Sequence, residues 1–289
     1  MDIEAIIQKA RPNLKPQSIK TYINNIRKIA GGKEIDNLDF LDDTTAVFSR
    51  LDEYKLTTKR NILSAILVVL GATDSLESLR KKYAAKLLEL TMVMREQLSK
   101  NEKTETQEKN WVKMDELRKI TKALIRNSPA SQNTMIASLY SLQPPQRLDY
   151  YDMEIVGPKH ERTNNKNYLV INNRSKKTFI FNDFKTSNSY NTVAIPVNKE
   201  LNTVINKFLK LNPERKYLLQ NKEGLPISRN NLGKTITKIF ASTGKQVSIN
   251  IIRHVYISEN VDMEAVKKSK EMAKSMLHDT STQIDYAKN

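Results

Sequence analysis

Apolar side chains recur at the spacing of an α-helix through the first hundred residues, and this pattern limits the fold more than any other feature of the sequence. In residues 18–29, apolar residues stand at positions 19, 22, 23, 26 and 29, which is one face of a helix. Similar segments follow at residues 45–51, 58–70 and 76–98. Strand-like alternation is hard to find in this part of the chain. Residues 1–100 are therefore predicted to form a helical domain of four helices.

The segment that follows has a different composition. Residues 101–110 are polar, mixed in charge and free of large apolar side chains. Such a segment lacks the apolar surface needed to pack into a core. It is interpreted as a linker, so that residues 111–289 form a second domain.

The second domain begins and ends with helical patterns. Helices are predicted at residues 111–120 and 134–140, and Pro144 and Pro145 break the second of them. Helical spacing returns at residues 200–209, after Ser228, after Gly244 and after Ser258. Ser18, Ser228 and Ser258 are the expected N-caps of their helices, because a serine hydroxyl can accept from a free backbone N–H of the first turn.

Between these helices lie three short runs rich in β-branched and aromatic residues, at 168–172, 178–181 and 192–196. Asn, Ser and Lys separate them, as is typical of turns. We expect a small antiparallel sheet of three strands, with Lys185 in the second connection. The predicted fold class is thus mainly α with a small antiparallel β-sheet (α+β).

The charge of the chain points to a polyanionic partner. The formal net charge is +16, and Lys and Arg outnumber Asp and Glu by 19 to 16 before residue 111 but by 29 to 16 from there on. Phosphates supply much of the affinity of such proteins, so nucleic acid is the favoured partner. A basic surface that is merely solvated is the alternative.

Other classes of protein are disfavoured. The sequence has no run of eighteen apolar residues, so no membrane span is expected. The first residues lack the pattern of a signal peptide, and there is no cysteine for a disulfide or a thiolate metal site. We therefore expect an intracellular protein.

Five residues of the second domain have side chains suited to attack on a phosphodiester. They are, in order, Arg147, Lys185, Arg253, His278 and Tyr286. Arginine binds phosphate oxygens through a planar fork, lysine can supply a proton, and tyrosine can be a nucleophile. Each residue also has a plainer interpretation: a surface arginine paired with Asp149 or Asp152, a solvated turn lysine, an exposed terminal tyrosine.

In this order the five residues resemble the catalytic set of the tyrosine recombinase (phage-type integrase) family, and most of all the integrases of DNA viruses and mobile elements, including those of the virophage type. The resemblance implies a core-binding domain at residues 1–100 that clamps double-stranded DNA, followed by a catalytic domain at residues 111–289. It also implies a covalent 3′-phosphotyrosyl intermediate on Tyr286, no cofactor and no metal ion, and a homo-oligomer, dimer or tetramer, on DNA. Such a protein would act wherever its target DNA lies, in the host nucleus or cytoplasm if it is viral.

The sequence departs from the family at one position. The family usually has His-x-x-Arg where this chain has Asn250 and Arg253. Asn250 shares a helix face with Arg253 and is a possible active-site residue, but an amide cannot accept a proton at neutral pH. The neighbouring His254 faces another side of the helix and is expected to be structural.

Two other functions stay open. A type IB topoisomerase shares the catalytic chemistry, and only three residues follow Tyr286, whereas many recombinases use a helix beyond the nucleophile to bind the next protomer. A DNA-binding protein without strand cleavage is the other alternative, which the replacement at Asn250 favours.

Overall fold

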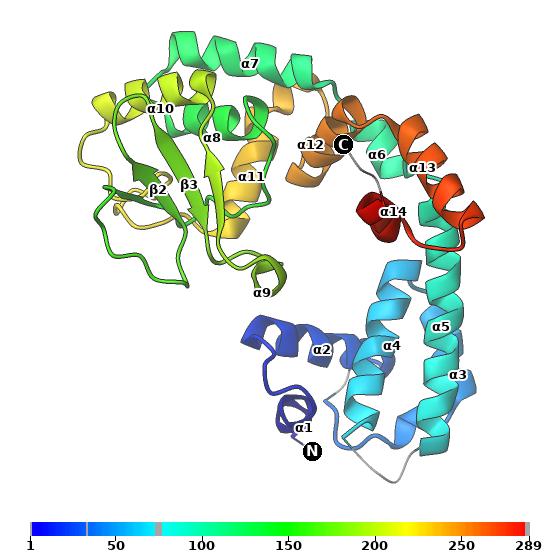
Figure 1. Cartoon of the computed structure of the whole chain (residues 1–289). Helices are drawn as coiled ribbons and strands as arrows, with labels where there is room; N and C mark the ends of the chain where they lie inside the picture. Colours follow the sequence, from blue (N-terminus) through cyan, green and yellow to red (C-terminus); the bar gives the residue numbers. More distant parts are fainter. Residues whose placement is uncertain (1, 33, 73–76, 287–289) are drawn as a thin grey trace. The chain divides into compact units, whose positions relative to one another are not determined.

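The computed structural model describes residues 2–32, 34–72 and 77–286 and divides the chain into two compact units, Met1–Glu102 and Lys103–Asn289 (Figure 1). Each unit has its own hydrophobic core. The segment expected to be a linker, residues 101–110, largely forms a helix of the second unit, α6 (Glu105–Asn110). Thr104 and Gln107 form a capping box at its start, which explains how so polar a segment becomes helical.

The first unit is helical. Its elements are α1 (Ile3–Ala10), α2 (Pro16–Ile29), the short 3-10 helix η1 (Asp39–Leu41), α3 (Thr44–Asp52), α4 (Leu56–Leu70) and α5 (Glu77–Ser99). Ile26 and Ile29 of α2, with Ile62 and Ile66 of α4, are fully buried, as the helical spacing predicts. Tyr83 of α5 closes this core and donates a hydrogen bond from its hydroxyl to the carbonyl oxygen of Leu41 at 2.8 Å.

Two details of this unit differ from the expectation. Helix α2 begins at Pro16, so Ser18 lies inside it and is not its cap; proline suits the first position because its missing N–H would have no partner there. The structure adds a further helix, α1, capped by Asp2. Leu76, expected in the last helix, lies outside the described residues.

The second unit surrounds a small sheet with helices. After α6 come α7 (Met114–Asn127), α8 (Gln132–Ser141), β1 (Glu154–Val156), β2 (Tyr168–Ile171), β3 (Lys177–Phe181), α9 (Ser187–Tyr190), β4 (Val193–Pro196), α10 (Lys199–Leu211), α11 (Arg229–Ile239), the 3-10 helix η3 (Ala241–Thr243), α12 (Ile249–Asn260), α13 (Met263–Ser275) and α14 (Thr280–Tyr286). This mainly helical architecture with one small sheet confirms the predicted fold class, except in the sheet itself.

The sheet is mixed, and the prediction of three antiparallel strands was wrong in this respect. The strand order is β1-β2-β3-β4, with β2, β3 and β4 antiparallel and β1 parallel to β2. Strand β1 has only three residues, all half-buried, which is too short to display an alternating pattern. Its carbonyl and amide groups find partners in β2 and around Tyr217.

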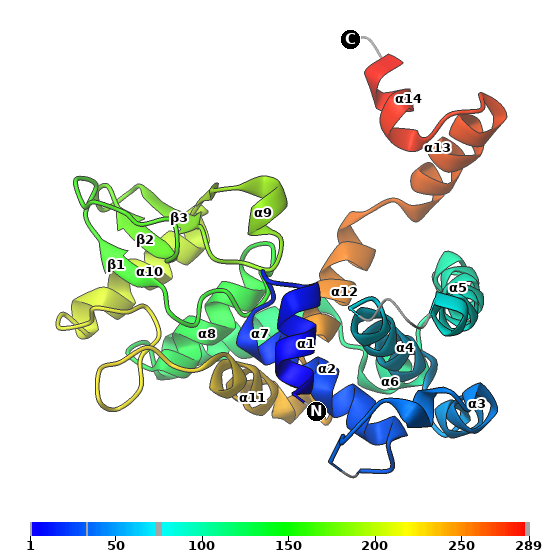
Figure 2. The same cartoon turned by 90° about the horizontal axis from the view of Figure 1, so that it is seen from below.

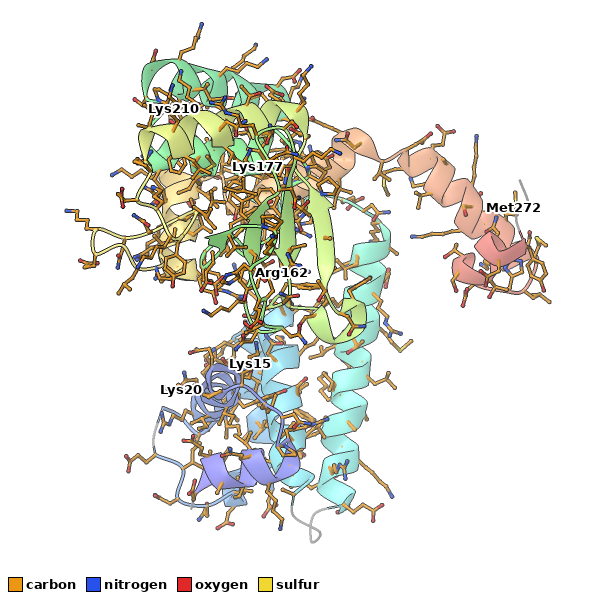
Figure 3. The ribbon with its side chains drawn as sticks, turned by 60° about the vertical axis from the view of Figure 1, so that its left-hand side comes forward. Lys15, Lys20, Arg162, Lys177, Lys210 and Met272 are labelled. Carbon is orange, nitrogen blue, oxygen red and sulfur yellow. The ribbon has the colours of Figure 1, made fainter. Side chains whose placement is uncertain are left out.

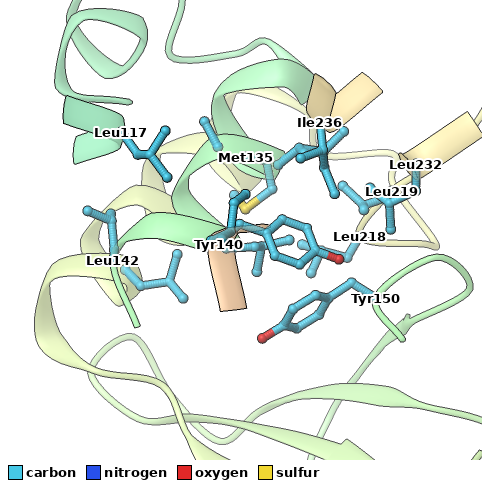
Figure 4. Packing of buried hydrophobic residues seen from close by; sticks show 14 of the residues in the cluster. Leu117, Met135, Tyr140, Leu142, Tyr150, Leu218, Leu219, Leu232 and Ile236 are labelled. Carbon is cyan, nitrogen blue, oxygen red and sulfur yellow. The ribbon is translucent and has the colours of Figure 1, made fainter. Parts of the chain in front are cut away.

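The core of this unit lies between the sheet and helices α7, α8, α10, α11 and α12. Tyr140 of α8 and Tyr150 pack edge to face there, with ring centroids 5.7 Å apart (Figure 4). Tyr150 also contacts Phe179 and Phe181 of β3. These aromatic contacts hold the turn after α8, which contains Arg147, against the sheet.

One charged side chain is buried between the sheet and α10. The ammonium of Lys177 in β3 donates to the side-chain oxygens of Asn202 and Asn206, at 2.8 and 2.6 Å (Figure 3). Burial lowers the pKa of Lys177. The side-chain amides of Asn202 and Asn206 therefore accept hydrogen bonds that water would accept if Lys177 were exposed. The same bonds connect α10 to β3.

The helix boundaries near the carboxyl end were predicted in part. Ser228 caps α11, as expected, by accepting from the amide of Asn231. Ser258 does not begin a helix, because α12 continues to Asn260 and Asp262 caps α13. None of the helices that the structure describes has the length and apolar character that crossing a membrane requires.

Candidate active site

Arg147 and Arg253 lie at one small pocket of the second unit. The pocket has a volume of about 190 Å³ and is lined by Gln146, Arg147, Asp149, Phe181, Phe184, Thr186, Tyr190, Val193, Ile195 and Arg253. The lining comes from the turn after α8, from β3, β4 and the connection between them, and from α12. The structure thus brings together two arginines that are far apart in the sequence, beside the loop that contains Lys185.

Hydrogen bonds fix the turn that contains Arg147. The guanidinium of Arg253 donates to the carbonyl oxygen of Pro145 at 3.0 Å, and the buried hydroxyl of Tyr140 donates to the carbonyl oxygen of Arg147 at 2.8 Å. Pro144 and Pro145 prevent α8 from continuing, so its end is followed by a turn. The side chain of Arg147 is exposed, whereas that of Arg253 is half-buried.

The pocket is electropositive with a buried carboxyl group at its side. Burial, followed by repulsion from Arg147, lowers the pKa of Arg253. Burial also raises the pKa of Asp149, against the pull of Arg229 and Arg147 in the opposite direction. Two guanidinium groups this close repel each other, and an anion such as a phosphate placed between them would relieve that repulsion.

Asp149 pairs with a different arginine from the one that the sequence suggested. The guanidinium of Arg229, the first residue of α11, lies 3.6 Å from the carboxylate of Asp149 and 3.7 Å from that of Asp183. It also stacks over the ring of Tyr151, 4.6 Å from the centroid. Sequence reasoning missed Arg229, although a cation at the start of a helix opposes the helix dipole and so indicates an acidic neighbour.

A buried amide joins the same two loops. Asn167, fully buried, donates from its side chain to the carbonyl oxygens of Asp149 and Asp183, both at 3.0 Å. Its side-chain oxygen accepts from the backbone amides of Asn182 and Asp183, at 2.9 and 3.0 Å. All four hydrogen-bonding positions of this amide are used, so it holds both loops with defined geometry. No periodic pattern marked Asn167.

Lys185 is exposed in the connection between β3 and β4, as the sequence predicted. The connection is more than a hairpin turn, because residues 187–190 form the short helix α9, which Figures 1 and 2 show at the end of the sheet. Thr192 anchors the far side of the loop by donating to the side-chain oxygen of Asn182 at 2.7 Å. Tyr190, which is 68% exposed, lines the arginine pocket from this loop.

His278, in the turn between α13 and α14, and Tyr286 of α14 form a second cluster. Their ring centroids are 5.8 Å apart. Leu277 has a left-handed backbone conformation, with φ of 58°, and this turn after α13 places His278 opposite α14. Among the described residues, no hydrogen bond, ion pair or ring contact joins either ring with Arg147 or Arg253. The five predicted residues are therefore found in two groups.

The helix pair α13 and α14 has little core of its own. Ala273 is the one buried residue of α13, and the side chains of Met272 and Met276 are more than half exposed. Met272 lies beside α14, where the side-chain amide of Gln283 contacts its sulfur at 3.1 Å (Figure 3). Few apolar contacts secure these helices, so they can change position at lower cost than the core helices can.

Asn250 and His254 are both exposed on α12. Asn250 is in the first turn, one helical turn before Arg253, as the spacing predicted. His254 does not contribute to the core, so the expected structural role has no support from packing. The parts of the chain that the structure describes contain no group of three or more His, Asp or Glu side chains placed to hold a metal ion.

Two solved structures have a fold similar to that of this chain. No protein-family model matches the sequence, and no curated protein matches it. Among solved structures, a lambda integrase dimer bound to a COC′ core site is similar with a TM-score of 0.55 and 14% identity, over 94% of this chain and 92% of that one. Lambda integrase bound to DNA is similar with a TM-score of 0.50 and 13% identity, over 92% and 90%.

At this level of identity the likeness concerns the fold. The chain has the fold seen in lambda integrase, in which a helical unit is followed by a unit with helices and a small sheet.

Proposed function

We propose that this protein is a site-specific DNA recombinase, or integrase, that cleaves and rejoins DNA strands through a 3′-phosphotyrosyl intermediate. One observation carries the proposal: within this fold, Arg147 and Arg253 line a single pocket beside the loop of Lys185. A pocket of this kind suits one phosphate group. The basic second unit is suited to the polyanion that would bring that phosphate.

In the proposed reaction, the Tyr286 oxygen attacks the phosphorus and the bond to the 5′-oxygen breaks. Arg147 and Arg253 stabilise the negative charge on the non-bridging oxygens, and Lys185 gives the leaving oxygen its proton. His278 takes the proton of the Tyr286 hydroxyl and then donates a hydrogen bond to a phosphate oxygen. A 5′-hydroxyl then attacks the phosphotyrosine and releases Tyr286, so resealing needs no external energy source. These residues do the chemistry without a cofactor.

The proposal requires the two groups of residues to meet on one phosphate. Helices α13 and α14, which flank His278 and carry Tyr286, have few buried contacts to hold them in place. A dimer or tetramer on double-stranded DNA would perform strand exchange between two sites. The resemblance of the sequence to integrases of DNA viruses and mobile elements makes the ends of such an element the first substrates to test.

The test is covalent capture. The protein is incubated with nicked duplexes that release a short fragment on cleavage, and the adduct is measured on a denaturing gel. Wild type is compared with Tyr286→Phe, with Tyr190→Phe and with Tyr217→Phe, a matched change outside both groups. We expect an adduct from wild type and from Tyr217→Phe, and none from Tyr286→Phe.

Other outcomes assign a different function. Loss of the adduct in Tyr190→Phe but not in Tyr286→Phe would place the nucleophile on α9, since Tyr190 lines the arginine pocket. Relaxation of supercoiled DNA without exchange products would favour a type IB topoisomerase. If no duplex gives an adduct and DNA binding weakens steeply as the salt concentration rises, the protein is a DNA-binding protein without strand cleavage. Asn250 and the separation of Tyr286 from the pocket support that alternative.

A further inference from the structure

Two independent bridges connect the loop of Arg147 with the loop of Lys185. Asp149 follows Arg147 by two residues, and Asp183 precedes Lys185 by two. Arg229 bridges the two carboxylates, at 3.6 and 3.7 Å. Asn167 bridges the two backbones through its side-chain amide. Each bridge comes from a part of the chain outside both loops.

We infer that Arg229 is a positioning residue, which sets the register between the phosphate-binding Arg147 and the proton donor Lys185 although it touches neither the phosphate nor the leaving group. This inference rests on the proposed function. The two loops differ in how they are held: aromatic packing and Tyr140 secure the Arg147 turn, whereas Lys185 stands exposed between β3 and α9. Through the two bridges, the secured loop of Arg147 determines the position of the loop of Lys185.

The charges favour the bridge. Asp149 and Asp183 repel each other, and burial already raises the pKa of Asp149. Arg229 offsets both effects because its Nη2 nitrogen lies 3.6 Å from the carboxylate of Asp149 and 3.7 Å from that of Asp183, while Tyr151 supports its flat face. Without the guanidinium, the two carboxylates would move apart or Asp149 would take up a proton. Either change would displace Lys185 relative to Arg147.

Asn167 explains why the bridge transmits position. It fixes the amides of Asn182 and Asp183, so the residues just before Lys185 have little freedom. Because these residues move together, a shift of the Asp183 carboxylate also displaces Lys185, two residues further along the loop. Misplacement of a reacting group by about 1 Å can cost about 10²-fold in rate.

The experiment compares Arg229→Gln with Lys234→Gln, which removes the same charge from an exposed position of the same helix. The cleavage position is first mapped from the wild-type adduct. Adduct formation is then timed on that duplex and on one in which sulfur replaces the bridging 5′-oxygen. A thiolate leaves without a proton because a thiol is far more acidic than an alcohol, so the sulfur duplex bypasses the acid.

For Arg229→Gln we expect adduct formation to slow by about 10²-fold on the oxygen duplex and to return to near the wild-type rate on the sulfur duplex, as for Lys185→Ala. The rate of Arg229→Lys, which keeps the charge but loses the planar group stacked on Tyr151, should fall between those of wild type and Arg229→Gln. DNA affinity should equal that of Lys234→Gln. The inference would be overturned if Arg229→Gln formed the adduct as fast as Lys234→Gln on the oxygen duplex. It would also be overturned if the rate of Arg229→Gln fell by the same factor on both duplexes.

Failure of the proposed function is distinguishable, because the wild type would then form no adduct on any duplex. In that case hydrogen exchange tests the bridge directly. The amides of Asn182 and Asp183 should exchange faster in Arg229→Gln than in Lys234→Gln, with the core amides unchanged. Equal exchange in the two variants would refute the bridge itself.

Discussion

The guanidinium of Arg253 donates a hydrogen bond to the carbonyl oxygen of Pro145 at 3.0 Å, across 108 residues of sequence. This bond ties α12 to the turn that contains Arg147. It uses one of the five N–H donors of Arg253 and leaves the others to face the pocket. Arg253 is thereby held beside the turn of Arg147 before any phosphate arrives, and such preorganisation lowers the cost of binding a charged transition state.

Arg253→Lys should slow adduct formation by about 10²–10³-fold, because an ammonium cannot bond to Pro145 and grip a phosphate oxygen with the geometry of the fork. DNA affinity should change little, since the positive charge stays. The rate of adduct formation and the Kd, measured at one salt concentration, check this. Arg126→Lys on α7 is the control, and a loss of the same size in that variant would contradict the assignment.

Tyr140→Phe should cost about 1–3 kcal/mol of the free energy of unfolding, because it leaves the carbonyl oxygen of Arg147 without its 2.8 Å donor. Adduct formation should slow as well. Tyr150→Phe removes a hydroxyl that accepts from Gln143 and does not touch Arg147. Urea denaturation should show both variants destabilised, and only Tyr140→Phe should lose cleavage. Equal cleavage in the two would disconnect Tyr140 from the site.

Asn250→His should give the cleavage rate a new dependence on pH centred near the usual imidazole pKa of about 6.5. Since a positioned general base contributes roughly 10²–10⁴-fold, we expect a rise of about tenfold or more at pH 7.5. Rates of adduct formation between pH 5.5 and 8.5 measure this. His254→Asn should leave the profile unchanged. A flat profile in Asn250→His would mean that position 250 lies outside the reaction.

Helix α14 should loosen in acid. Hydrogen bonds from the Ser281 hydroxyl and from the amides of Thr282 and Ser281 lower the pKa of Asp279 from 3.8 to about 2. Because the folded pKa is the lower one, the stability that this carboxylate gives α14 is complete above about pH 4 and is lost as the pH falls through about 2. Amide signals of Ser281 and Thr282, followed by NMR from pH 5 to 2, should report the change.

Asp279→Asn supplies the control for that titration. The asparagine side chain can still accept from the same amides but does not ionise, so its α14 signals should be independent of pH over this range. If the wild type and Asp279→Asn behave alike, the carboxylate is not what secures the start of α14.

Much of the architecture could be predicted from local pattern. The burial of Ile26 and Ile66, the cap at Ser228 and the loop position of Lys185 all depend on neighbours within a few residues, and such spacing is written directly in the sequence. The errors in the predicted helix and strand boundaries also arose from local features of the sequence. Proline at position 16 displaced Ser18 as the start of a helix, and β1 was too short to recognise.

The amino-acid sequence by itself determined the helical first domain, the class of the second and the residue types on which the proposed chemistry rests. Only the tertiary structure decided that Arg147 and Arg253 share a pocket, that Arg229 and Asn167 bridge two loops, and that His278 and Tyr286 form a separate pair. The physical reason is range. Helical and strand periods are set by nearest neighbours along the chain, whereas the meeting of distant loops is set by core packing and by the burial of charges, which no local pattern records.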